Sequence, residues 1–211
     1  MTPYRTAAGY GEAEYEDKRS RFIGHIKPVT SENEAKAFID EMRRTYADAT
    51  HNVFAYVLRE GNILRWSDDG EPGGTAGKPI MDVLTGRGLT NVLCVVTRYF
   101  GGIKLGASGL IRAYSHAAAL ALDEASVVDY TPFTVLTATV AYPLVSTLER
   151  FAESHGVLIT DRAFAADVTF TFEVPEGNSA AFMADLTNTT NGRASLQKTG
   201  TVVKPVPVTE S

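Results

Sequence analysis

The amino-acid sequence predicts an α+β fold built from two domains. Its length of 211 residues allows one large domain or two small ones, since domains average roughly 150 residues. The pattern up to residue 130 mixes strands and helices without a repeat, whereas the later pattern follows the ferredoxin-like order β-α-β-β-α-β. We therefore expect domains at residues 1–130 and 131–211, with a short boundary near Asp129–Pro132.

The first expected elements are a tail, a strand and a helix. Residues Met1–Gly11 are polar and lack periodicity, so we expect a mobile tail, and Arg21–Val29 has the pattern of a strand. Ser31 and Glu34 have the spacing of a capping box, in which each side chain satisfies a free backbone amide of the other. The helix that follows has one apolar stripe at 3.6-residue spacing, formed by Ala35, Phe38, Ile39, Met42 and Tyr46.

A hairpin, a buried strand and a long helix complete the first domain. Asn52–Leu58 and Ile63–Trp66 are short strand patterns joined by the turn signal Glu60-Gly61-Asn62. Val92–Val96 is wholly apolar, which predicts a central strand buried on both faces. Ser108–Glu124 is rich in alanine and predicts a helix that packs closely against the sheet.

The second domain shows a regular alternation of strand and helix patterns. The expected elements, in order, are a strand at Phe133–Ala141, a helix from Pro143 to Gly156, strands at Val157–Thr160 and Val168–Val174, a short helix marked by Phe182, Met183 and Leu186, and a strand at Ser195–Val203.

Composition and charge exclude several classes of protein. Apolar residues make up 44% and charged residues 21%, and the net charge of -5 argues against a basic domain that binds polyanions through bulk charge. The single cysteine, Cys94, excludes a disulfide framework and is expected to be an inert core thiol. Apolar runs fall far short of the ~20 residues that span a membrane, and the N-terminus lacks a secretory apolar region. We expect a cytoplasmic protein with no membrane contact, no DNA partner and no cofactor.

Ten of the 18 glycines fall between Gly70 and Gly109, in two loops of opposite charge. Residues 66–82 hold four acids against one lysine, whereas residues 83–122 hold four basic residues and no acid. A basic, glycine-rich turn that leads into a helix N-terminus favours an anion, because free N–H groups and the helix dipole attract negative charge. The same bases also fit a solvated rim. The turn is not a nucleotide-binding P-loop, since Ala107-Ser108 stands where a Lys-Ser/Thr pair is required.

The candidate binding residues are cations, aromatic rings and glycines of the basic loop, with a polar pair that opens a strand. The cations would contact phosphate oxygens or an acidic protein surface, and the rings would stack on a base or fill a pocket. The polar pair orders the hairpin or lines a surface, and buried polar side chains more often bond to backbone. The candidates are Arg98, Tyr99, Phe100, Gly101, Gly102, Lys104, Gly106 and Arg112, with the polar pair His51 and Asn52.

No catalytic constellation is predicted, and the metal candidates are weak. Asp68, Asp69 and Glu71 could offer oxygen ligands, but their spacing is not that of an EF-hand, and such carboxylates more often cap nearby amides. The four histidines are scattered without metal-ligand spacing. Ser108 and His116 lie two turns apart on one expected helix, too far for a direct hydrogen bond.

Five stretches of the first domain match one known family in residues and in order. They are Glu16–Ile23, Ala49–Tyr56, Ser67–Pro79, Val95–Gly106 and Gly109–Tyr114. On these residues the chain resembles the IMPACT/YigZ family in its bacterial two-domain form. Ala107-Ser108 is a minor departure from the family pattern.

The resemblance implies a fold for each domain. The first would have the ribosomal small-subunit protein domain-2-like fold, which is also seen in domain IV of elongation factor G and can contain a left-handed crossover. The second would be similar to domain V of that factor. Eukaryotic members are translation regulators that bind the ribosome-associated activator of an amino-acid-starvation kinase, so the resemblance implies a link to translation and the stress response. A bacterial form does not inherit that partner automatically.

Three interpretations of function follow from the sequence. The first is a non-catalytic cytosolic protein that binds RNA, the ribosome or an acidic translation-related protein through its basic glycine-rich loop. The alternative is a metal-assisted hydrolase of a phosphorylated or peptide substrate, with the acidic loop holding a divalent cation. In the third, the two loops only pair their charges inside the fold.

Overall fold

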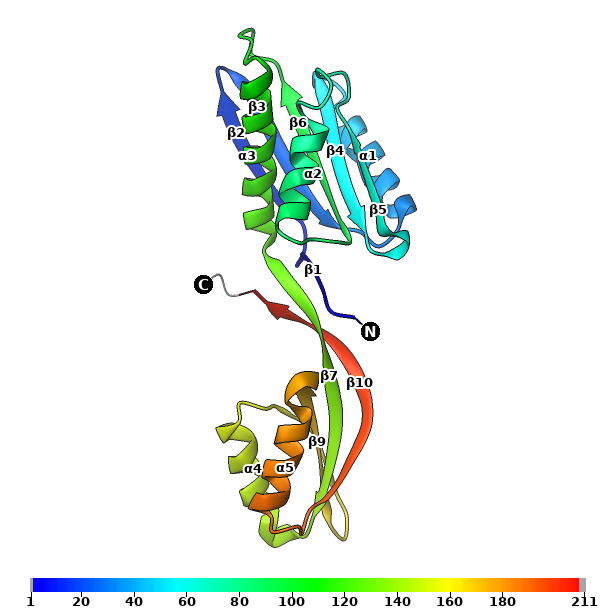
Figure 1. The fold of residues 1–211 in the computed structure, drawn as a ribbon, viewed down its shortest axis with the longest axis vertical. Helices are drawn as coiled ribbons and strands as arrows, with labels where there is room; N and C mark the ends of the chain where they lie inside the picture. The colour runs from blue at the N-terminus through cyan, green and yellow to red at the C-terminus, as the bar shows by residue number, and fades with distance from the viewer. Residues whose placement is uncertain (1, 209–211) are drawn as a thin grey trace. The chain divides into compact units, whose positions relative to one another are not determined.

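The computed structural model describes residues 2–208, and the chain forms two compact units. The N-terminal unit comprises Tyr4–Asp129 with residues 205–208, and the C-terminal unit comprises Tyr130–Lys204 with residues 2 and 3. Each unit has its own hydrophobic core. Figure 1 shows the strands β7 (Val127–Val140) and β10 (Ser195–Pro207), each of which contributes residues to both units.

The N-terminal unit is built on a five-stranded antiparallel sheet in the order β2-β3-β6-β4-β5. Its strands are β2 (Gly11–Asp17), β3 (Ser20–Pro28), β4 (His51–Leu58), β5 (Ile63–Ser67) and β6 (Val92–Tyr99). The central strand β6 is buried from Val92 to Arg98. This confirms the buried strand expected at Val92–Val96, and the pairing of β4 with β5 confirms the expected hairpin.

Helices cover both faces of this sheet (Figure 1). α1 (Glu32–Thr45) packs on one face, and α2 (Gly77–Gly86) and α3 (Ala107–Ala125) pack on the other. α3 approaches β3 closely because Gly24 has no side chain there, and a Cβ on Gly24 would overlap the carbonyl oxygen of Ala117. The close packing expected for the alanine-rich helix is confirmed.

The connection from β5 to β6 has an unusual hand. Both strands are antiparallel to β4, which lies between them, so β5 and β6 run parallel. α2 joins them over the same face as α3 (Figure 1). With this face toward the viewer and both strands pointing up, the chain moves from right to left, so the crossover is left-handed. About 98% of such crossovers are right-handed, and the exception is one that the family resemblance allowed.

The cap of α1 differs in one detail from the expected capping box. Ser31 Oγ accepts a hydrogen bond from the Glu34 N–H at 3.2 Å, as expected. The Glu34 carboxylate accepts from the N–H of Thr30 at 2.6 Å, one residue before Ser31. This backbone hydrogen bond lowers the pKa of Glu34. The helix therefore begins where the sequence indicated, with its reciprocal contact moved by one residue.

The prediction of a mobile tail at the N-terminus is wrong, because part of this segment forms a strand. Tyr4–Ala7 forms β1, and Ala7 is buried. The segment is fixed by backbone hydrogen bonds, including Ala8 N–H to the Ser126 carbonyl at 3.0 Å. Polar side chains anchor it as well, since Arg5 Nε donates to Asp129 Oδ1 at 2.8 Å and Thr6 Oγ1 donates to the Asn91 carbonyl at 3.0 Å. Such polar contacts leave no periodic apolar signal in the sequence. Met1 lies outside the described residues.

The C-terminal unit has the ferredoxin-like order that the sequence predicted. Four strands of its five-stranded sheet run β10-β7-β9-β8, and the fifth, β1, also pairs with β7. Both helices of the unit contribute to a single core. The remaining elements of this unit are α4 (Val145–Ser154), β8 (Ile159–Phe164), β9 (Val168–Pro175), α5 (Ser179–Thr189) and the 3₁₀ turns η2 (Tyr142–Leu144) and η3 (Glu176–Asn178). A further 3₁₀ turn, η1 (Glu60–Asn62), belongs to the N-terminal unit. Within residues 2–208, no helix combines the length and apolar character that a membrane crossing requires.

Candidate nucleic-acid interface

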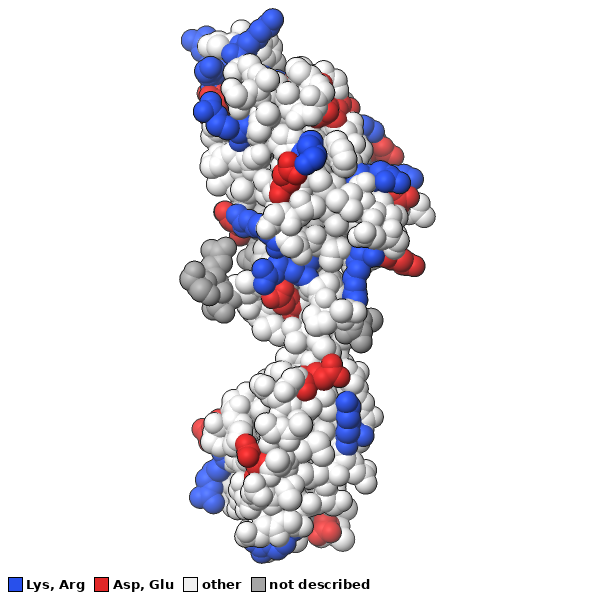
Figure 2. Space-filling model, viewed as in Figure 1, with Lys and Arg blue, Asp and Glu red and all other residues white. Residues whose placement is uncertain are grey.

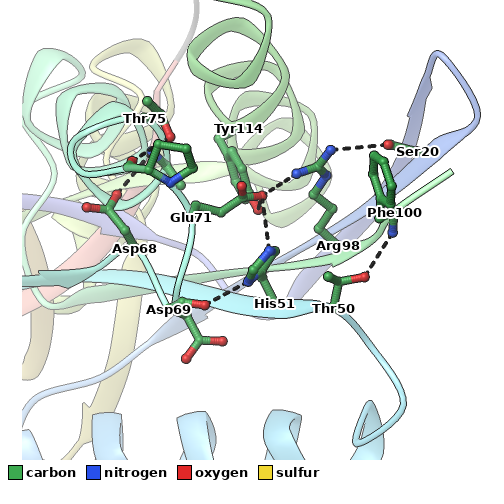
Figure 3. A network of polar contacts seen from close by, with 12 residues as sticks. Ser20, Thr50, His51, Asp68, Asp69, Glu71, Thr75, Arg98, Phe100 and Tyr114 are labelled. Carbon is green, nitrogen blue, oxygen red and sulfur yellow. Dashed lines mark hydrogen bonds and ion pairs between the residues drawn. The ribbon is translucent and has the colours of Figure 1, made fainter. Parts of the chain in front are cut away.

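The acidic and the basic glycine-rich loops meet at one end of the N-terminal sheet, where a buried carboxylate joins them (Figure 3). Glu71 Oε1 accepts hydrogen bonds from Arg98 Nη1 at 2.5 Å and from the Tyr114 hydroxyl at 2.7 Å. All three side chains are buried. Burial, together with the hydrogen bond to the carboxylate, raises the pKa of Tyr114, so it remains a neutral donor. A buried charge needs a partner, and Glu71 and Arg98 supply one to each other.

Arg98 lies in the interior, which corrects its expected place on the exterior. Its second Nη donates to Ser20 Oγ at 3.3 Å. Its guanidinium carbon lies 5.4 Å from the ring centre of Phe22 and 5.5 Å from that of Phe100. The guanidinium is neutralised and enclosed, so for this residue the pairing of charges inside the fold is the correct interpretation.

The burial of Arg98 has a signal in the sequence. Val92, Cys94 and Val96 lie in the core between the sheet and its two helices α2 and α3. Side chains alternate between the faces of a strand, so Arg98 continues that inward face. Cys94 is completely buried, which confirms its expected place in the core, and this burial raises the pKa of its thiol.

The polar pair His51 and Asn52 fastens the acidic loop to β4. His51 Nδ1 bonds to the carbonyl oxygen of Asp69 at 2.7 Å, and its Nε2 lies 3.8 Å from Glu71 Oε1. The Asn52 N–H donates to Asp69 Oδ2 at 2.7 Å, and the Asn52 side chain accepts from Thr97 Oγ1 at 2.7 Å. These contacts favour the ordering role over the surface role.

Asp68 satisfies the backbone at the start of α2. Its Oδ1 accepts from the N–H groups of Ala76 at 3.1 Å and Gly77 at 2.8 Å, and its Oδ2 accepts from Gly74 at 2.9 Å. A carboxylate at a helix N-terminus also interacts favourably with the helix dipole. Over residues 2–208, no group of three or more His, Cys, Asp or Glu side chains is arranged to hold a metal ion. Asp68 and Asp69 thus cap backbone amides, as the sequence favoured, whereas Glu71 pairs with Arg98 and Tyr114 instead.

The basic loop leaves the end of β6 and turns toward α3. The Tyr99 hydroxyl donates to Asp48 Oδ1 at 2.8 Å, and the Phe100 N–H donates to Thr50 Oγ1 at 3.0 Å. Phe100 is 46% exposed, so part of it is accessible to a partner. Two glycines of the loop have positive φ, +84° at Gly102 and +76° at Gly106, and Gly106 offers no side chain to cap α3.

A second basic segment, which the sequence interpretation missed, lies beside this loop. Asp17 and Ser20 are paired across β2 and β3, so Lys18-Arg19 is the whole connection between the two strands. A Cβ on Gly101 would overlap the Arg19 backbone, and the Gly101 N–H donates to Ser20 Oγ at 3.2 Å. The tip of the hairpin and the basic loop are therefore in contact. The segment was missed because β2 was not recognised as a strand.

Four cations form what we call the basic end: Lys18, Arg19, Lys104 and Arg112. All four are exposed, and within residues 2–208 none has an ion-pair partner. Lys104 follows Gly101 by three residues, which places their Cα atoms within about 11 Å. Arg112 and Asp17 line the same shallow hollow of about 780 Å³. Figure 2 shows Lys and Arg side chains gathered over the end of the unit where Figure 1 places the β2–β3 connection and the segment before α3.

Comparisons with known proteins agree with this architecture. Residues 18–122 match the model of the Impact N-terminal domain, and residues 139–193 match that of a domain of unknown function, DUF1949. The IMPACT family member YvyE of Bacillus subtilis is 38% identical, over 92% of this chain and 90% of that protein. The IMPACT family member YigZ of Escherichia coli is 34% identical, over 86% and 90% respectively.

The other comparisons extend to a eukaryotic protein and to a solved structure. Protein IMPACT of Homo sapiens is 32% identical over 96 residues, which are 43% of this chain and 29% of that protein. A crystal structure described as that of a hypothetical protein is 32% identical, has a TM-score of 0.59 and covers 95% of this chain and 98% of its own. With both family models matched in order along one fold, this chain belongs to the IMPACT family.

Proposed function

We propose that this chain is a non-catalytic binding protein that acts close to translation and docks on the phosphate backbone of RNA through its basic end. The observation that carries the proposal is the grouping of four exposed cations without ion-pair partners, Lys18, Arg19, Lys104 and Arg112, on a chain of net charge -5. Cations that no carboxylate of the protein neutralises can bind phosphates, and in doing so they release the counterions that are condensed on the RNA.

Exposed apolar side chains beside these cations also support an RNA ligand. Phe100 is 46% exposed and Ile103 44% exposed, and both lie in the loop that carries Lys104. Aromatic rings next to cations are typical of surfaces that bind single strands, because bases stack on the rings while cations bind the backbone. An acidic protein surface would use the same cations with less need for an exposed ring.

The link to translation comes from the family. The chain is related to eukaryotic proteins named IMPACT, and the family resemblance implies translation regulation for those members. We propose a ribosomal or translation-associated RNA as the partner in the cell, which is a cytoplasmic role. The metal-assisted hydrolase gains no comparable support, because Asp68 and Glu71 already accept hydrogen bonds from the protein's own groups.

The proposal predicts binding to a short labelled single-stranded RNA that weakens steeply with salt. If all four cations contact phosphates, the logarithm of the association constant should fall with log salt at a slope of about −3 between about 50 and 200 mM salt. Replacing two of them, in Lys104→Ala with Arg112→Ala, should reduce the slope to about −1.5. Fluorescence anisotropy measures both slopes.

A matched pair of cations on α1 provides the control. Lys36 and Arg44 are exposed and belong to the helix on the other face of the sheet, so Lys36→Ala with Arg44→Ala removes the same charge at another place. This variant should keep the wild-type slope within about 0.5. Absence of RNA and ribosome association at low salt, in the wild-type protein, would refute the proposed function.

A further inference from the structure

We infer that the Lys18-Arg19 turn is the principal phosphate-binding element of the basic end, and that the fold keeps it at a cost in stability. This inference rests on the proposed function and assigns it to two residues. Both residues of the turn have a left-handed backbone, with φ +47° at Lys18 and φ +65° at Arg19.

Two adjacent long side chains are a poor choice for this backbone. A two-residue hairpin connection with positive φ at both positions strongly favours Asn-Gly, since a Cβ in the left-handed region is crowded by the neighbouring carbonyl oxygen. Elsewhere in residues 2–208, the non-glycine residues with positive φ carry short polar side chains. They are Asn62, Asp69, Asn91, Ser126 and Asn191. Lys18 and Arg19 are the exceptions in this set, and they are adjacent.

Within residues 2–208, no ion pair or hydrogen bond of the Lys18 and Arg19 side chains offsets the cost of this backbone. Both side chains are exposed, and within the described part of the chain neither has an ion pair or a side-chain hydrogen bond. Backbone strain that the fold does not need for its own contacts is often found at binding sites. The charges of Lys18 and Arg19 therefore act outside the protein.

The turn is also held in one position. Ser20 Oγ accepts hydrogen bonds from the Gly101 N–H at 3.2 Å and from the buried Arg98 guanidinium at 3.3 Å. Gly101 leaves no room between the basic loop and the Arg19 backbone. Because these contacts fix the turn next to the loop before any ligand arrives, little conformational freedom of its backbone is lost on binding. Buried Arg98 is thus a positioning residue for the turn.

The ligand that fits is the phosphodiester backbone of RNA. Two adjacent cations at the tip of a hairpin reach outward to charged oxygens, and they offer no fixed pattern for reading bases. Binding through them should depend on salt and be nearly independent of sequence. The exposed Phe100 ring beside the turn favours single strands over duplexes.

The test separates charge from backbone strain with two variants. Lys18→Asn with Arg19→Gly removes the charges and installs the favoured turn pair, whereas Lys18→Gln with Arg19→Gln removes the charges and keeps the unfavourable backbone. Both should lower the RNA association constant about tenfold at low salt and reduce the salt slope by about 1.4. Only the Asn-Gly variant should melt at a higher temperature than the wild type, by roughly 2 to 8 °C.

The control is Lys36→Gln with Arg44→Gln on α1, which should change neither RNA affinity nor the salt slope. Wild-type RNA affinity in both turn variants, combined with weaker binding by Lys104→Ala with Arg112→Ala, would overturn the inference and leave the proposed function intact. An Asn-Gly variant no more stable than the Gln variant would overturn the claim of a stability cost. Failure of the wild-type protein to bind RNA, or RNase-resistant capture by an acidic protein instead, would overturn both proposals.

Discussion

Glu71 is the residue on which the candidate site depends most for its stability. Its carboxylate is the counter-charge of the buried Arg98 and accepts a hydrogen bond from Tyr114 as well. Replacing it with glutamine keeps the size but leaves a guanidinium in the interior without an opposite charge. Removing one partner of a buried ion pair costs far more than the pair contributes in net terms, because the remaining charge stays desolvated.

Glu71→Gln should lower the free energy of unfolding by about 3 kcal/mol. Urea unfolding followed by circular dichroism measures this difference. Glu124→Gln is the control, since Glu124 is exposed on α3, and it should stay within about 0.5 kcal/mol of the wild type. Equal stability of the two variants would mean that the Arg98 guanidinium is hydrated or paired by another group.

Among the elements, the packing of α3 on β3 is set by a residue without a side chain. Gly24 lies beneath Ala117 and Ala121, and any Cβ there would overlap the helix backbone. Gly24→Ala should therefore push α3 off the sheet and lower the free energy of unfolding by about 2 kcal/mol or more. Thermal unfolding measures the loss.

Gly86→Ala is the matched control for this substitution. Gly86 is exposed at the end of α2, and a Cβ there meets nothing within 4 Å. Alanine is the better helix former, so this variant should be as stable as the wild type or more stable by about 0.5 kcal/mol. A Gly24→Ala protein that melts with the control would show that α3 can shift at no cost.

The elements that the sequence predicted are those whose own residues show a clear pattern of apolar or small side chains. The apolar run Val92–Val96 and the alanine pattern at Ser108–Glu124 correspond to β6 and α3. α2 gave no such signal, because Gly77-Lys78-Pro79 is typical of a loop, although proline is tolerated in the first turn of a helix. β1 was missed because its partners are distant in sequence.

The sequence predicted the candidate site in part. The glycine clustering and the opposite charges identified two loops that do lie together. The sequence alone did not show which cations are neutralised. Arg98 is paired by Glu71, 27 residues away, and Lys104 has no ion-pair partner within residues 2–208. Lys18-Arg19 became apparent only from the β2–β3 pairing and the contact with Gly101, because β2 was not recognised from the sequence.

For the whole molecule, the distribution of charge matters more than its sum. The net charge of -5 repels a polyanion, whereas the exposed cations of the basic end attract it. Under the proposed function, such an uneven field would orient an approaching RNA toward one end of the N-terminal unit and make association faster at low salt. The C-terminal unit is not required for this attraction, since all four cations of the basic end belong to Tyr4–Asp129.

The two units also have separate cores, so they should lose their structure separately. Phe172 is completely buried in the core of the C-terminal unit, and the clusters of the N-terminal unit share no residue with that core. Phe172→Ala should cost about 3 to 5 kcal/mol in that unit alone. In calorimetry it should lower one of two transitions by roughly 10 °C or more and leave the other in place. RNA affinity at a temperature below both transitions should be unchanged.

Gln197→Ala, an exposed position on β10, is the control and should move neither transition. A single transition that shifts as a whole would show that β7 and β10 couple the units into one cooperative fold, and loss of RNA binding would place part of the interface in the C-terminal unit.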